Sequence, residues 1–185
     1  RNNVIKNKNI NEILDSFLNE VILELKENKL KYLAKPNSNE FENKFKSIFG
    51  KSFSEDEINK LKNEKDEGFE KLINEKYLNK KNERINLLGE DGAEEIEKRI
   101  FLQVLDQNWK LHIQYLEQLR QVIGLRSFGQ RDPLIEYKKE AFTLFENLLS
   151  KLKYNIITFL INLKVVDNSK EKANFKEIQN EKFKE

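Results

Sequence analysis

Residues 124–133, with the sequence GLRSFGQRDP, combine side chains suited to binding within one short segment. The ring of Phe128 offers an apolar or stacking surface. Arg126 and Arg131, together with Arg120 just before the segment, could contact acidic or carbonyl-rich surfaces of a partner, cap the last carbonyls of a preceding helix, or simply be solvated. This composition is hard to explain for a linker, so the sequence predicts that function lies here.

Two long amphipathic helices are needed to position this segment. Before it, apolar residues recur at steps of three and four: Ile96, Ile100, Phe101, Val104, Leu105, Trp109, Ile113, Leu116, Leu119 and Ile123. After it, the stripe contains Leu134, Phe142, Phe145, Leu148, Leu149, Leu152, Ile156, Phe159, Leu160 and Leu163. Asp132 suits the N-cap of the second helix and Pro133 its first residue. Two such faces joined by a short loop predict an antiparallel helical hairpin.

The first part of the chain predicts another long helix. Asn9 and Glu12 can cap its start, and Pro36 opposes its continuation, which leaves roughly 25 residues, or about 37 Å at 1.5 Å per residue. The predicted apolar stripe comprises Ile10, Ile13, Leu14, Phe17, Leu18, Val21, Ile22, Leu25, Leu30 and Leu33.

A polar region, residues 37–88, predicts a small helical subdomain that depends on other parts of the molecule for stability. Its apolar residues are sparse: Phe41, Phe45, Ile48, Phe49, Ile58, Leu61, Phe69, Leu72, Ile73 and Tyr77. Gly50 should end a short helix, and Ser54 with Glu57 forms a capping box for the next one.

Glycines in this region predict weak points. Gly68 should weaken the middle of a helix by roughly 1 kcal/mol relative to alanine. Residues 89–92, GEDG, predict a break, after which Asp91 and Glu94 start the first helix of the hairpin.

Composition excludes several classes of function. The chain has no cysteine, which rules out disulfides, zinc–thiolate sites and thiol nucleophiles. A net charge of +2, from 34 basic and 32 acidic residues, disfavours RNA binding through the arginine-bearing loop, because nucleic-acid-binding domains concentrate a basic excess. The single histidine, His112, is expected to be a packed side chain rather than a ligand or general base, and Trp109 is expected to be core.

Location and completeness are also open to prediction from the sequence. Neither a secretory signal nor an apolar segment of membrane-spanning length is present, so a reducing, cytoplasmic location is expected. Methionine is absent even at position 1, which predicts that the sequence is a piece of a longer protein.

Two segments of the hairpin carry a family resemblance. Residues 102–112 contain an LQ-x-x-D-x-x-W-x-x-H element, and residues 119–138 read LRQVIGLRSFGQRDPLIEYK. As a linked set, over about residues 89–165, they resemble the C-terminal part of the SecA family, the ATPase motors of bacterial preprotein translocation. Residues 1–88 resemble that family only in the order and helical character of their elements.

The resemblance implies a domain order for an all-α, elongated molecule. Residues 1–34 would be the end of a long scaffold helix, and residues 35–90 a helical wing domain. Residues 91–165 would be the two-helix finger with its supporting scaffold helix, and residues 166–185 a charged flexible tail.

In that family the finger tip reaches the mouth of the SecYEG channel at the inner membrane, touches the translocating chain and restrains the motor's ATPase. The resemblance therefore implies a polypeptide-contacting tip made of Leu125, Arg126, Ser127, Phe128, Gly129, Gln130 and Arg131. Phe128 stands where the family commonly has tyrosine, so its contact would be apolar or stacking, without a phenolic hydrogen bond. The alternative is that this ring folds back over the end of the hairpin.

The resemblance also indicates what this segment lacks. ATP and magnesium bind the motor domains of the family, but the sequence has neither a G-x-x-x-x-G-K-[ST] element nor the metal-binding Cys/His tail that holds zinc. We therefore expect no catalytic residue, cofactor or metal here, and we expect the parent's motor domains, SecYEG and unfolded preprotein as partners. A structural helical adaptor that docks partner helices is the alternative function.

Overall fold

All regular structure in the described part of the chain is helical, which confirms the all-α prediction. The computed structural model describes residues 10–34, 40–50, 52–130 and 132–164, with only the backbone described for Tyr32, Ala34, Ser127 and Phe128. The elements are α2 (Ile10–Ala34), α3 (Glu40–Phe49), α4 (Glu55–Asn63), α5 (Asp66–Val122), the 3₁₀ helix η1 (Ile123–Gly129) and α6 (Pro133–Asn162).

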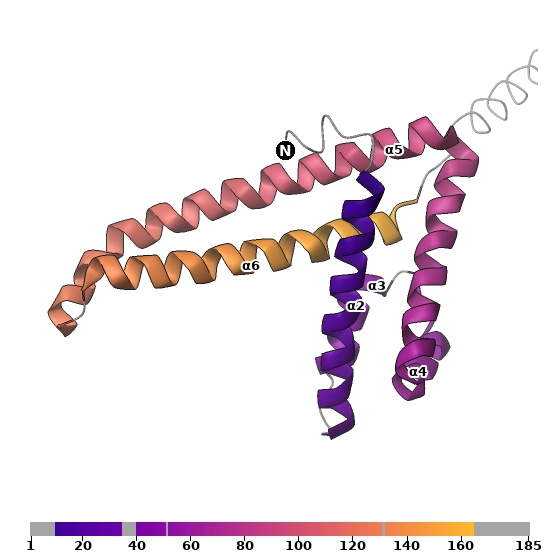
Figure 1. Ribbon diagram of the computed structural model, residues 1–185, viewed down its shortest axis with the longest axis horizontal. Helices are drawn as coiled ribbons and strands as arrows, with labels where there is room; N and C mark the ends of the chain where they lie inside the picture. Colours follow the sequence, from indigo (N-terminus) through magenta and orange to yellow (C-terminus); the bar gives the residue numbers. More distant parts are fainter. Residues whose placement is uncertain (1–9, 35–39, 51, 131, 165–185) are drawn as a thin grey trace, which may run out of the picture.

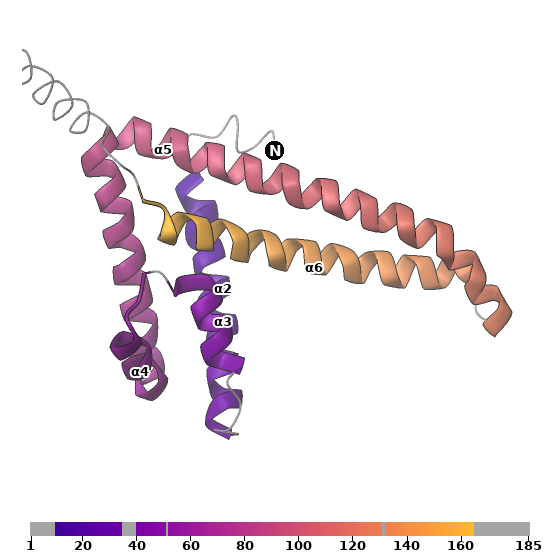
Figure 2. The same cartoon turned by 180° about the vertical axis from the view of Figure 1, so that it is seen from behind.

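The helices form two arms that project in different directions from a common junction (Figure 1). We call α2, α3, α4 and residues 66–88 of α5 the bundle arm, and residues 90–122 of α5 with η1 and α6 the hairpin. The long helices of the hairpin run antiparallel, as predicted (Figures 1 and 2).

Asp132 caps α6 as expected, because its Oδ1 atom accepts hydrogen bonds from the amides of Leu134 (2.8 Å) and Ile135 (3.4 Å).

Helix α2 spans the 25 residues that its apolar pattern predicted. Its fully buried apolar residues are Ile10, Leu14, Leu18, Val21, Ile22 and Leu25. The prediction that Leu30 and Leu33 extend this face is wrong, since they are 57% and 53% exposed. The buried face continues instead through Lys29, whose ammonium group donates to the carbonyl of Glu64 and lies 4.9 Å from the centroid of the Phe69 ring.

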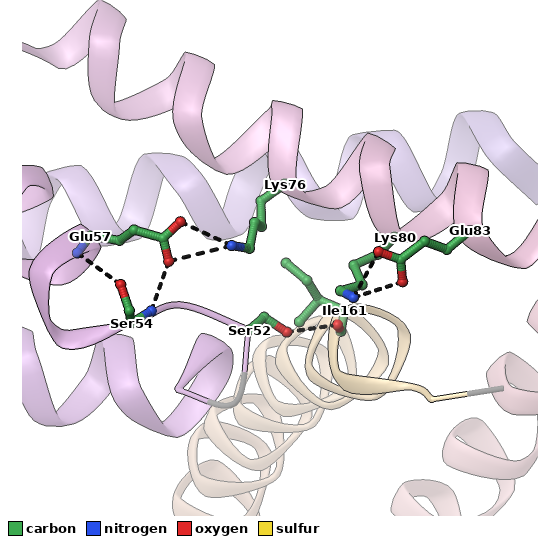
Figure 3. A network of polar contacts seen from close by, with 7 residues as sticks. All are labelled: Ser52, Ser54, Glu57, Lys76, Lys80, Glu83 and Ile161. Atoms are coloured by element: carbon green, nitrogen blue, oxygen red, sulfur yellow. Dashed lines mark hydrogen bonds and ion pairs between the residues drawn. The ribbon is translucent and has the colours of Figure 1, made fainter. Parts of the chain in front are cut away.

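A cluster of phenylalanines holds the short helices of the bundle arm together. Its ring centroids lie 5.1–6.5 Å apart, and its members are Phe41, Phe45, Phe49, Phe53 and Phe69. Gly50 follows α3 where the sequence placed its end. The capping box is confirmed: the Glu57 amide donates to Ser54 Oγ (3.3 Å), and the Ser54 amide donates to the Glu57 carboxylate (2.7 Å; Figure 3).

The weak point expected at Gly68 is placed wrongly, because Gly68 lies in the first turn of α5 and not in the middle of a helix. The backbone leaves the helical conformation at Glu64 and Lys65, where both residues are extended. The Glu64 side chain then fills the space beside Gly68, and a Cβ at that glycine would lie 2.5 Å from the Glu64 Oε1 atom.

Helix α5 bends at Gly89, which separates the bundle arm from the hairpin. This residue has φ +76° and ψ 169°, a conformation essentially restricted to glycine. The break predicted at residues 89–92 is therefore confirmed. The helix resumes directly after Gly89, however, so Asp91 lies inside the helix rather than before its first turn, because one residue suffices to redirect the chain.

The core of the molecule lies where the two arms meet. We call Leu152–Ile161 of α6, with Ala93–Val104 of α5, the hairpin base. Its side chains that pack into the hydrophobic core with those of α2 and α3 are Phe101, Val104, Leu152, Ile156, Ile157, Leu160 and Ile161. The end of α6 is also fixed by polar contacts: Ser52 Oγ donates to the Ile161 carbonyl (2.8 Å; Figure 3), and Asn162 Nδ2 donates to the Ile48 carbonyl (2.8 Å).

Candidate functional site: the outer hairpin and its tip

The predicted binding segment lies at the end of the hairpin that is farthest from the bundle arm (Figures 1 and 2). The expected open loop is partly helical, because residues 123–129 form η1. A 3₁₀ turn often follows the end of an α-helix, where its tighter hydrogen bonding satisfies the last carbonyls. The two long helices are therefore joined by η1 and the turn that follows it, rather than by an open loop.

The described side chains of the tip are solvent-exposed, and they include one charged group, Arg126. Leu125 is 65% exposed. Arg126 Nη2 lies 2.7 Å from Glu140 Oε1, so its guanidinium joins the tip to α6, while Arg120 Nη2 pairs with Glu117 Oε1 at 2.9 Å within α5. Glu140 was not predicted, because its pairing depends on how the chain turns between the helices. Exposed pairs of this kind are weak, so a partner could exchange them for its own groups.

The tight turn of the tip falls on Gln130, not on a glycine. Gln130 has φ +56°, the left-handed region that favours glycine and asparagine. Gly124 and Gly129 keep ordinary φ values, and a Cβ built on either of them meets no atom within 4 Å. Neither glycine is therefore required by local sterics.

The predicted contact made by Phe128 is not tested by the structure. Its side chain and that of Ser127 lie outside the described residues, as does the whole of Arg131. The backbone of Ser127 and Phe128 belongs to η1.

The face of α5 that meets α6 is rotated from the predicted one. Trp109 and Ile113, expected in the core, are 49% and 48% exposed. Asn108 and His112, each one residue earlier, are buried instead. The Asn108 Oδ1 atom accepts a hydrogen bond from Asn155 Nδ2 of α6 (3.3 Å), which gives a buried amide a partner. A hydropathy pattern cannot predict this, because it assigns the buried positions to the most apolar residues.

The rotation leaves a strip of large apolar side chains in solvent. The Trp109 ring lies 5.6 Å from that of His112, and the His112 ring lies 6.0 Å from that of Phe145 on α6. His112 is thus a packed side chain, as predicted. Phe142 and Leu149 share a helix face with Phe145, because they lie three and four residues from it. We call Trp109, Phe142, Phe145 and Leu149 the outer apolar strip; their exposed fractions are 39–62%.

A hollow of about 170 Å³ opens between α5 and α6 in the same part of the hairpin. Its lining residues are Asn108, Leu111, His112, Tyr115, Leu144, Asn147, Leu148 and Lys151. Aliphatic walls with amide and ammonium groups suit binding to polypeptide groups.

Within the described ranges, no three His, Asp or Glu side chains gather as a metal site would require. None of the described helices is long and apolar enough to cross a lipid bilayer.

Two titratable groups with shifted pKa values, Glu24 and Tyr154, lie where α2 meets the hairpin base. Burial raises the pKa of Glu24, but the ammonium group of Lys44, which donates to the carboxylate, and the nearby Tyr154 hydroxyl lower it by more, so the net pKa falls below its usual value. Burial, followed by the adjacent Glu24 carboxylate, raises the pKa of the Tyr154 hydroxyl. These groups join α2, α3 and α6, so their role is to hold the base together.

Comparison with known proteins agrees with the motifs in the hairpin. The family model described as the SecA wing and scaffold domain matches residues 1–164. The chain is 54% identical over 171 residues to the protein translocase subunit SecA of Pelagibacter ubique, which covers 92% of this chain and 20% of that protein. The SecA subunit of Wigglesworthia glossinidia brevipalpis is 34% identical over 171 residues, or 89% of this chain and 20% of its own length. The chain thus spans about one fifth of these relatives.

Proposed function

The chain belongs to the SecA family, and from this premise we propose that it transmits the motion of a translocase motor to a polypeptide in transit. In this proposal the hairpin carries its tip, residues 125–131, to the mouth of the SecYEG channel, where the tip contacts unfolded preprotein. ATP and magnesium are bound by motor domains elsewhere in the parent protein, and the hairpin regulates that motor. The parent would act in the cytoplasm, peripherally at the inner membrane.

The observation that carries the proposal is a stiff pair of helices that is buried at one end and exposed at the other. Helix α6 has 30 residues, which corresponds to about 45 Å at 1.5 Å per residue. Its base is packed into the core, while Leu125 at the tip is two-thirds exposed. Displacement of the base would therefore be carried to the tip without much bending. An exposed tip suits contact with polypeptides of any sequence better than a shaped pocket would.

The outer apolar strip supports a contact with another part of the parent protein. Contiguous exposed apolar surface of this kind usually marks an interaction site. Because about four fifths of each relative lies outside the matched region, the motor domains are the partner that this proposal assigns to the strip.

The test is crosslinking from position 128 in the assembled parent protein with SecYEG and a preprotein. We expect a photoreactive group at this position to capture the preprotein during translocation. Phe128→Ala should abolish coupling of ATP hydrolysis to transport while leaving the helical circular dichroism unchanged. Phe128→Tyr is the matched control, because it keeps the ring and should keep transport. If crosslinks from position 128 never capture preprotein, the tip mechanism is wrong.

A structural adaptor is the second candidate, and the outer apolar strip is the observation that favours it. An adaptor would dock a partner helix on this strip without any role in translocation. Pull-downs with a SecA motor core and with SecYEG separate the two functions, since the adaptor predicts that neither is retained. Phe142→Ser should weaken retention by the motor core, while Phe128→Ala should not.

A further inference from the structure

The two arms are joined in the sequence through one residue that lies in open surroundings. Gly89 is that residue, and a Cβ placed on it meets no atom within 4 Å. The surroundings of Gly89 would therefore permit other directions of the hairpin. Something else in the molecule has to select the observed one.

A buried ion pair spans this bend. Arg84 lies in the bundle arm five residues before Gly89, and Glu97 lies in the hairpin eight residues after it. Arg84 Nη2 lies 2.7 Å from Glu97 Oε1, and Arg84 Nε donates to the same oxygen at 3.3 Å. Both side chains are only 2% exposed.

The same guanidinium also reaches the second helix of the hairpin. Arg84 Nη1 donates to the Leu160 carbonyl (2.8 Å), which lies in the last turn of α6. A cation is favourable at this position because the carbonyl end of a helix carries a partial negative charge. Ser52 also binds this end of α6, but Arg84 differs because it binds both helices of the hairpin at once.

Buried charges impose geometry more strictly than apolar contacts do. An arginine fork has donors in fixed directions, and a carboxylate left without its partner in a dry interior is strongly unfavourable. A change in the angle at Gly89 would separate Arg84 from Glu97 or from the Leu160 carbonyl. The apolar neighbours could slide past one another with a smaller loss.

We propose that Arg84 and Glu97 form a latch that fixes the direction of the hairpin relative to the bundle arm, with Gly89 as the hinge. Opening of the latch lets the hairpin pivot about one residue, as hinge motions do at glycines between rigid helices. This inference does not depend on the proposed function, because it concerns only the angle between two parts of the chain.

Pulsed electron paramagnetic resonance can measure that angle as a distance. The chain has no cysteine, so spin labels on Lys60→Cys in α4 and Gln118→Cys in the hairpin report one distance between the arms. Both positions are exposed. The test variant is Arg84→Met with Glu97→Met, since replacing both members of a buried ion pair by apolar side chains usually preserves stability. The control is Lys80→Gln with Glu83→Gln, a pair one turn earlier on the surface (Figure 3).

We expect the latch variant to keep its helical circular dichroism while the width of its distance distribution increases about twofold or more. The control variant should keep the narrow distribution of the unmodified chain. A narrow, unshifted distribution in the latch variant overturns the proposal, because packing alone would then set the angle. If the latch variant loses its helices, Glu97→Met alone takes its place in the same measurement; it removes the acceptor of Arg84 while Arg84 can keep its bond to the Leu160 carbonyl, and an unchanged distribution again overturns the proposal.

Discussion

The hairpin base and the outer hairpin belong to the same two helices but differ in how they are held. In the base, α6 buries Ile156, Ile157, Leu160 and Ile161 completely. In the outer part, the same helix leaves Leu134, Ile135, Phe142 and Phe145 40–62% exposed, although they are no less apolar. Apolar residues therefore have different roles along one helix: those at the base hold the fold, and those farther out are available to a partner.

Two ion pairs show the same contrast. The Arg84–Glu97 pair joins the bundle arm to the hairpin base across the bend at Gly89, and it lies out of solvent. In the outer hairpin the Arg120–Glu117 pair lies within one helix turn and is exposed. We infer that the base sets the stability of the fold and the direction of the hairpin, while substitutions in the outer hairpin leave the fold nearly unaffected.

The largest expected effect is at the base. Ile156→Ala should lower the free energy of unfolding by about 2–5 kcal/mol, because the side chain is fully buried and its removal leaves a cavity. Phe142→Ala, in the outer hairpin, should change it by less than about 1 kcal/mol despite removing a larger side chain. Urea unfolding followed by circular dichroism measures both. Equal losses in the two variants would contradict the division between base and outer hairpin.

The second prediction concerns two glycines, one on each side of that division. Gly89→Ala should lower the free energy of unfolding by about 1–3 kcal/mol, because its backbone conformation is strained for any residue with a Cβ. Gly129→Ala should instead be neutral or stabilise by about 0.4–1 kcal/mol, since its φ is ordinary and its surroundings are open. Thermal melts of the two variants should shift in opposite directions or by clearly different amounts. A loss at Gly129 as large as that at Gly89 would show that the tip is as constrained as the bend.

The sequence predicted those parts of the fold that depend on local chemistry. The length of α2, the capping box at Ser54, the cap at Asp132 and the antiparallel hairpin were confirmed, because apolar spacing and capping act over a few residues. The rotation that buries Asn108 in place of Trp109 could not be predicted, because it depends on an amide of the other helix.

The latch was missed for a related reason, although a signal was present. Arg84 lies seven residues after Tyr77 on the buried face of α5, and Glu97 lies four residues before Phe101 on the next buried face. Extending each apolar stripe by helical spacing would have reached both charges. The sequence predicts a break at residues 89–92, but it does not give the direction of the bend that brings the two charges together.

The third prediction uses acid to test an ion-pair cluster within the bundle arm. Hydrogen bonds from Lys46 and Lys62 lower the pKa of Glu42 from 4.5 to about 2. The unfolded chain therefore binds this proton first, so stability from Glu42 is fully present above pH 4.5 and is lost as pH falls toward 2. In Glu42→Gln the free energy of unfolding should fall less steeply over this pH range. The difference should be less than about 1 kcal/mol, because the pairs are partly solvated.

The check for this prediction is the unfolding midpoint of both proteins at several pH values from 5 to about 2, at low and high salt. The difference between them should shrink in about 1 M salt, which screens the pairs. The distance between spin labels at positions 60 and 118 should not change in Glu42→Gln, because Glu42 joins α3 and α4 only within the bundle arm. If the unfolding midpoint depends on pH identically in both proteins, this cluster does not contribute to stability.

The smallest expected effect is at the tip. Gln130→Gly removes the strain of a left-handed residue, worth about 1–2 kcal/mol, but adds a similar loss of backbone entropy on folding, about 0.5–1 kcal/mol. The net change in the free energy of unfolding should therefore stay within about 1 kcal/mol. Gln130→Val, whose branched side chain opposes this φ, should loosen the turn, seen as faster amide hydrogen exchange in residues 123–130, while exchange at Leu152–Ile161 is unchanged. Faster exchange at the base in this variant would mean that the turn and the core open together, and that the hairpin is one cooperative unit from tip to base.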